Sequence, residues 1–148
     1  MINDNLKLKG RVAMVLRDAQ GNVKAEQEIN NLVVNSGLDF IASRMKDATA
    51  TAMSHMAIGA GTTAAAAGDT ALESELGRNA LTSTTVTSNA VAYVATFGAG
   101  VGTGAVTEAG LLNAGTGGDM LCRTVFSVVN KAADDSLQIT WTVTLSAA

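Results

Sequence analysis

The chain has 148 residues with 13 acidic and 10 basic side chains, so its formal net charge is −3, and its 47% hydrophobic content excludes a disordered chain. The pI near 5.0 argues against a nucleic-acid partner, because such proteins normally present a basic surface. The single Cys122 and the single His55 exclude an intramolecular disulfide and a multi-cysteine or His-rich metal site. The chain has no signal-peptide pattern and no apolar run of ~20 residues, so we expect one soluble domain over residues 1–148 and no membrane partner.

The first strands are predicted by strict alternation of apolar and polar side chains. Residues 6–17 place apolar side chains on one side and basic ones on the other, which is the pattern of a half-buried strand. Turn-forming residues occupy 18–22, and the alternation resumes over 23–29. Residues 6–34 therefore predict a β-hairpin, and the polar residues 1–5 before it are a candidate N-terminal arm.

Two short helices are predicted in the first half of the chain. Ser36 is suited to cap a helix over residues 36–47, where apolar side chains recur at helical spacing. Thr70 and Glu73 form a capping-box pattern, which predicts a second helix over residues 69–76.

The rest of the chain is predicted to be β-structure. Short strand candidates separated by turn residues occur at 53–58, 81–88, 91–97, 106–112, 120–129 and 137–145, and the alternation of apolar and polar residues is clearest at 137–145. Such spacing predicts a mainly β fold, an antiparallel β-sandwich or barrel with one or two short helices. Trp141 lies in the last of these strands, and we expect it in the core with Phe97 and Phe126.

Glycines cluster in two expected loops, over residues 59–69 and 98–105. A phosphate-binding loop runs from a strand into a helix and ends in Gly-Lys-Ser/Thr, and neither loop ends in this way. We interpret both as flexible loops that become ordered against a neighbouring molecule.

The titratable residues do not form a convincing catalytic group. His55 is the only imidazole, and the adjacent Ser54 is expected to point to the opposite face of the strand. Cys122 is expected to be a buried small hydrophobe. Two carboxylate pairs are interpreted as a helix cap and a hairpin turn: Glu73 with Glu75, and Asp134 with Asp135. We therefore expect no enzyme activity, no catalytic or cofactor-binding residue, no cofactor and no metal site.

Charge is distributed unevenly along the chain. Residues 1–50 have a balance of +1, whereas residues 51–148 have a balance of −4. The basic side chains of the first strand share one face and are the candidate interface residues: Lys7, Lys9, Arg11 and Arg17. This face is either a docking strip for an acidic partner or a solvated strand face, and the sequence leaves both readings open.

Five segments resemble a family of small virion structural proteins of tailed bacteriophages, whose members are often described only as tail-fibre-like or structural. The segments are Asn31–Met45, Met56–Thr63, Gly68–Arg78, Thr107–Asn113 and the closing Trp141–Thr144. The resemblance spans most of the chain, and the segments are distinctive as a set, although no single one is diagnostic. The family carries no catalytic motif, so the resemblance transfers no active-site residue.

The resemblance implies a component of the phage particle, made in the host cytoplasm and located on the virion. Capsid decoration or cement proteins are typically single small β domains that bind over capsomer junctions, whereas tail fibre, collar or baseplate subunits are usually longer and repetitive. This chain has no repeats, which favours decoration of the capsid exterior. The implied partners are the major capsid protein, or tail proteins in the alternative, and further copies of the chain itself as a homo-oligomer, with a trimer as the candidate.

Overall fold

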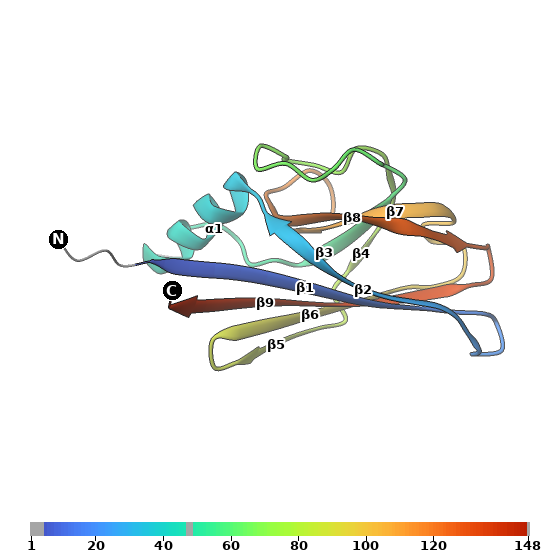
Figure 1. Cartoon of the computed structure of the whole chain (residues 1–148). Coiled ribbons are helices and arrows are strands. Elements are labelled where there is room, and N and C mark those ends of the chain that lie inside the picture. The colour runs from blue at the N-terminus through green and yellow to red at the C-terminus, as the bar shows by residue number, and fades with distance from the viewer. Residues whose placement is uncertain (1–4, 47–48, 148) are drawn as a thin grey trace.

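The computed structural model describes residues 5–46 and 49–147, which form nine antiparallel strands and one helix (Figure 1). The elements are β1 (Leu6–Arg17), β2 (Val23–Val33), α1 (Asn35–Lys46), β3 (His55–Gly59), β4 (Glu75–Ala80), β5 (Ser83–Thr87), β6 (Ala90–Phe97), β7 (Gly104–Leu112), β8 (Met120–Lys131) and β9 (Ser136–Ala147). The predicted mainly β, antiparallel fold is confirmed. Of the candidate arm over residues 1–5, only Asn5 lies within the described residues.

The strands form one sheet in the order β4-β3-β7-β8-β2-β1-β9-β6-β5, which curls into a half-barrel. The curl centres on β2, which pairs with β1 along most of its length but with β8 only at Leu32 and Val33. Where the backbones of β2 and β8 are no longer paired, a side chain connects the two strands: Gln27 Nε2 on β2 donates to the Ser127 carbonyl on β8 at 2.6 Å. The sheet therefore has two layers that face each other across a shared core. One layer consists of β2, β1, β9, β6 and β5, and the other consists of β4, β3, β7 and β8, with α1 at one end (Figure 1).

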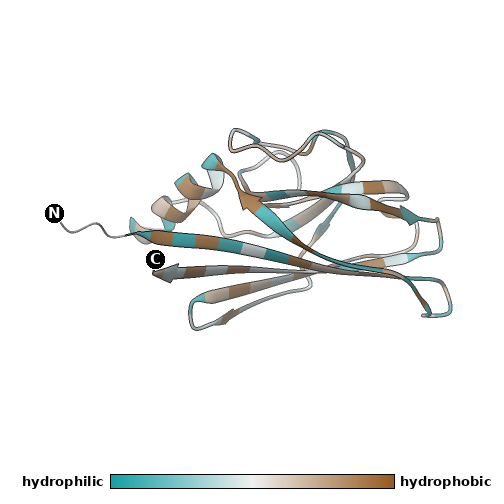
Figure 2. Ribbon diagram, in the orientation of Figure 1, coloured by the Kyte–Doolittle hydropathy of each residue, from teal (hydrophilic) through white to brown (hydrophobic). Residues whose placement is uncertain are grey.

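The core follows from the alternation along β1 and β9. Hydrophobic and hydrophilic residues alternate along β1 (Figure 2), and its inward residues Val12, Met14 and Leu16 are buried. Trp141 on β9 is fully buried, as predicted. It lies opposite Val12 of β1 on one side and opposite Tyr93 of β6 on the other. The expected aromatic neighbours are buried as well, Phe97 fully and Phe126 at 8% exposure.

The helix α1 confirms the first helix prediction, and residue 47 of that prediction lies outside the described residues. The expected role of Ser36 as a cap is wrong, because its Oγ donates to the Met120 carbonyl of β8 at 2.7 Å. A side chain at Gly37 would clash with the backbone of Leu121, so this glycine permits close contact between helix and strand.

The predicted second helix over residues 69–76 is wrong. Residues 69–74 form an irregular loop, and residues 75 and 76 already belong to β4, in which Gly77 pairs with Ile58. The N–H groups of Glu73 and Ser74 donate to the Glu108 carboxylate on β7, at 3.0 and 2.7 Å. A tertiary partner has therefore replaced the local helical hydrogen bonds that the capping-box pattern predicted.

Candidate interface face

The candidate site is the outer face of the five-stranded layer, defined here as the side of β2, β1, β9, β6 and β5 that points away from the core. The strand registers place its side chains in rows across the layer. One row runs from Arg11 on β1 through Thr142 and Ala92 to Thr85 on β5. Neighbouring rows repeat this chemistry, so the part formed by β9, β6 and β5 consists mainly of small, uncharged side chains.

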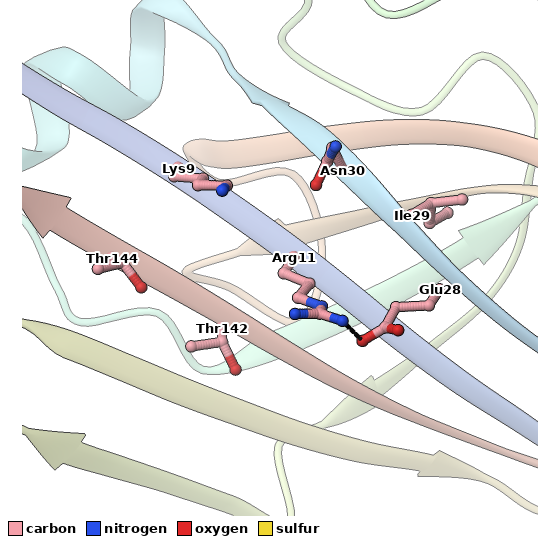
Figure 3. A pocket seen from close by; sticks show the side chains of 7 residues that line it. All are labelled: Lys9, Arg11, Glu28, Ile29, Asn30, Thr142 and Thr144. Atoms are coloured by element: carbon pink, nitrogen blue, oxygen red, sulfur yellow. Dashed lines mark ion pairs between the residues drawn. The ribbon is translucent and has the colours of Figure 1, made fainter.

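A shallow hollow of about 610 Å³ lies on the β1 side of this outer face. Figure 3 shows its lining residues, which are Lys9, Arg11, Glu28, Ile29, Asn30, Thr142 and Thr144. Arg11 forms an ion pair with Glu28, and both side chains are more than half exposed. The hydrogen bond from Arg11 lowers the pKa of Glu28, so this carboxylate stays charged and the wall of the hollow has mixed charge.

The structure divides the predicted basic strip. Lys7, Lys9 and Arg11 follow one another at every second position on the outer face, as the alternation predicted. Arg17 lies at the far end of β1, where its guanidinium donates to the Gly21 carbonyl at 3.2 Å. Between these two groups the β1 residues are apolar, and their partners on β2 include Glu28. The continuous basic strip therefore consists of Lys7, Lys9 and Arg11, and Arg17 lies apart from it at the other end of β1.

The part of the outer face formed by β9, β6 and β5 carries no charge. Residues 79–107 contain no Asp, Glu, Lys or Arg, and they include all of β5 and β6. On β9 the outward residues Thr140, Thr142 and Thr144 each face a small side chain or valine of β6. Small, uncharged side chains on adjacent strands leave this area without bulky or charged groups, which suits contact with another protein surface.

A buried ion pair on the opposite layer was not anticipated from the sequence. Glu108 is fully buried, and Arg123 is 2% exposed. Two guanidinium nitrogens of Arg123 donate to Glu108 Oε2 at 3.0 and 2.9 Å, and a third donates to Asp69 at 2.8 Å. The available signal was a charged residue within each of the apolar stretches 106–112 and 120–129.

The same ion pair holds the loop over residues 60–74. Glu108 accepts three backbone N–H groups, from Gly61, Glu73 and Ser74, and Arg123 donates to the Thr63 carbonyl. Burial by itself raises the pKa of Glu108, but these N–H groups and Arg123 outweigh it and lower the pKa below its ordinary value. The loop is therefore anchored on a permanent charge inside its own chain.

The second glycine-rich loop, over residues 98–104, is also held within the chain. Lys131 is almost fully buried, and its Nζ donates to the Gly98 carbonyl at 2.8 Å. Gly100 N donates to the Ala133 carbonyl at 2.8 Å. Both glycine-rich loops are thus held by hydrogen bonds within the chain. The sequence had instead suggested that they become ordered against a neighbouring molecule.

The remaining titratable residues have structural surroundings. Ser54 Oγ and His55 Nδ1 are hydrogen-bonded at 2.7 Å. The expectation that these two side chains point to opposite faces of a strand is therefore wrong, since β3 begins at His55 and Ser54 lies before it. Burial raises the pKa of Cys122 to about 12, which confirms it as a buried thiol. Asp135 accepts the Ala132 N–H in the β8–β9 turn, as predicted for that carboxylate pair.

No family profile, curated protein or solved structure matches this chain. Among residues 5–46 and 49–147, no cluster of three or more His, Cys, Asp or Glu side chains is arranged to hold a metal ion. The helix in the described part of the chain is too short and too polar to cross a membrane.

Proposed function

We propose that this chain is a non-enzymatic structural protein of a tailed-phage virion, and that it decorates the outside of the capsid at the junctions between capsomers. The observation that carries the proposal is the outer face, a broad surface of small uncharged side chains bordered by Lys7, Lys9 and Arg11. The resemblance noted in the sequence supplies the phage context, and the geometry supplies a surface suited to docking.

The two parts of the outer face serve different purposes in this proposal. The threonine and alanine rows of β9 and β6 form the uncharged area that lies against the shell. The three basic side chains orient the protein on an acidic part of the major capsid protein, since charges at the margin of an interface mainly set encounter rate and register. Binding is then expected to weaken as salt is added, because exposed charges are screened within about 10 Å at 0.1 M salt.

Rigidity is the second requirement of a protein that spans a seam. Packaged DNA places an expanded shell under internal pressure, and added contacts across capsomer junctions resist it. The continuous sheet, the core around Trp141 and the anchored loop over residues 60–74 give this chain a stiff body. Many copies that also contact one another multiply each weak contact by avidity.

The proposal is tested first by location. Cryo-EM of the phage that encodes this chain is expected to show its density in a regular lattice on the shell. Density confined to the tail would overturn decoration and favour a tail fibre, collar or baseplate component. A hydrolase or transferase activity of the purified protein, with no affinity for shells or tails, would overturn the structural role altogether.

A binding experiment tests the basic margin separately. The triple variant Lys7→Glu, Lys9→Glu, Arg11→Glu is expected to bind emptied shells at least about 10-fold more weakly than the unmodified protein. The matched control is Arg17→Glu, which reverses one charge at the far end of the same strand and is expected to bind normally. Equal loss in both proteins, or in neither, would remove this strip from the interface.

The candidate arm over residues 1–5 is tested by a deletion that ends before β1. Residues 6–9 belong to β1 and pair with β9, so removing residues 1–9 would damage the sheet as well as the arm. Removing residues 1–4 leaves β1 intact and is expected to reduce shell binding if the arm contributes to docking. Unchanged binding would show that residues 1–4 do not contribute to docking, and the proposed location of the protein on the shell would not be affected.

A further inference from the structure

The sheet ends in two edge strands, β4 and β5, and the two edges differ in how they are protected. An unpaired edge exposes a row of backbone N–H and C=O groups that another strand is able to pair with. Proteins commonly block such edges with charged side chains, prolines or β-bulges. A comparison of the two edges therefore shows which one remains available for pairing.

The β4 edge carries these protective features. It contains Glu75 and Arg78, whose side chains form an ion pair at 2.7 Å. Its register with β3 shifts between Ile58 and Gly59, which makes the end of the strand irregular. A partner strand would therefore meet the partly exposed Glu75 carboxylate and a break in the backbone ladder at this edge.

The β5 edge has none of these features. Its sequence is Ser-Thr-Thr-Val-Thr over Ser83–Thr87, all five residues are exposed, and its register with β6 is uninterrupted. Val86 is 69% exposed, although it is the one aliphatic residue of the strand. β-Branched residues favour strand pairing, and four of these five residues are β-branched.

The inner side of β5 supplies an apolar contact for a partner. The register places Thr84 opposite Tyr93 and Val86 opposite Val91, on the side that faces the core. Val91 and Tyr93 also line an apolar groove beneath α1. A strand added next to β5 would therefore extend the sheet and cover Val86 in the same step.

We propose that β5 pairs antiparallel with β5 of a second copy of this chain, about a twofold axis, so that two nine-stranded sheets join into one. The proposal rests on the self-association included in the proposed function and names the surface that performs it. The charge pattern suits a second copy as the occupant. Residues 79–107 are uncharged, so two copies of this edge meet without like-charge repulsion, whereas a charged partner edge would find no complementary charge. A twofold contact makes the dimer the smallest assembly.

Sedimentation equilibrium of the full chain tests the pairing. The mass is expected to rise from 15.0 kDa toward twice that value as the concentration increases from about 1 µM to about 1 mM, because a five-residue edge gives a small, weak interface. Val86→Lys is expected to weaken this association at least about 10-fold, because the twofold axis brings two added charges together. The matched control is Val128→Lys on β8, the same change at a side chain that is 50% exposed, and it is expected to associate normally.

A mixing experiment identifies the strand involved. Val86→Lys and Val86→Glu are each expected to associate at least about 10-fold more weakly than the unmodified protein, whereas an equimolar mixture is expected to recover dimers, because opposite charges then lie on adjacent strands. A protein that stays monomeric throughout the concentration range, or an unchanged association of Val86→Lys, would overturn the proposal. Shell binding is measured separately on the same proteins, so failure of the pairing is distinguishable from failure of the proposed function.

Discussion

At the scale of single residues, Glu108 holds three backbone groups of a loop far from it in the sequence. Its carboxylate accepts three N–H groups of the loop over residues 60–74 and contacts Arg123 at full burial. The buried Glu108 carboxylate is stable as a charged group because both of its oxygens accept hydrogen bonds. Removal of its charge leaves the buried Arg123 guanidinium without its main counterion. The energetic consequence is therefore expected to exceed that of any exposed ion pair in the chain.

Glu108→Gln tests this statement directly. The variant keeps the shape of the side chain but removes its charge, and we expect it to lower the free energy of unfolding by about 3 kcal/mol. Glu75→Gln is the matched control, because Glu75 is 37% exposed in its pair with Arg78 and is expected to cost under about 1 kcal/mol. Urea unfolding measures both, and equal losses would contradict the role assigned to Glu108.

The lowered pKa of Glu108 predicts a loss of stability in acid. A carboxyl with a lower pKa in the folded state than in the unfolded state stabilises the fold above its ordinary value, here 4.5, and this contribution disappears as the pH falls through the folded-state pKa. We expect the free energy of unfolding to decrease as the pH falls below about 4.5, and to decrease less in Glu108→Gln. NMR shifts of the Gly61, Glu73 and Ser74 amides are expected to follow the same titration. Amide shifts that stay constant throughout would contradict it.

Trp141 is the largest fully buried side chain. Trp141→Ala is expected to cost about 3–5 kcal/mol of unfolding free energy, measured by circular dichroism in urea. The indole N–H has no hydrogen-bond partner among the described residues, so Trp141→Phe loses no hydrogen bond and is expected to cost clearly less than the alanine variant. Fluorescence typical of a solvated indole in the unmodified protein would contradict the burial.

At the scale of elements, the two hairpins of the large layer turn in different ways. The β1–β2 turn uses Gly21 at a φ of 86°, where glycine is unstrained. The β5–β6 turn uses Ser88 at a φ of 53°, the one non-glycine residue with a positive φ in the described part of the chain. The second turn is therefore strained, although Asn89 anchors it by donating to the Leu145 carbonyl at 2.7 Å.

Ser88→Gly is expected to relieve this strain and raise the unfolding free energy by about 0.5 kcal/mol, after the entropic cost of the added glycine. The reverse exchange, Gly21→Ser, is expected to lower it by about 1 kcal/mol, because no other atom lies near that position and strain alone acts. Thermal unfolding compares the two variants. A destabilised Ser88→Gly protein would show that the turn is not strained.

The success of the sequence predictions differed between elements for a physical reason. The strands over 6–17, 91–97 and 137–145 were predictable because period-two alternation is a local property of each strand. The helix over 69–76 was wrong because its N–H groups are satisfied by Glu108, which lies 34 and 35 residues away in the chain. A capping pattern describes a local preference, and a buried carboxylate provides a stronger alternative.

At the scale of the whole molecule, the candidate interface was only partly visible in the sequence. The alternation placed Lys7, Lys9 and Arg11 on one face, which the structure confirms. The neutral part of that face was not visible, because it comes from β5, β6 and β9, whose adjacency to β1 depends on the strand order. The separation of Arg17 from the strip depends in turn on the hairpin, where it contacts Gly21.

By itself, the sequence determined which residues form most strands, which side of each strand is apolar, and that Trp141 belongs in the core, since each follows from local periodicity and side-chain chemistry. Tertiary structure alone decided the strand order, the pairing of Glu108 with Arg123, and the contrast between a protected β4 edge and an open β5 edge. These features join residues far apart in the chain. Their energies depend on burial and on partners that no local pattern contains.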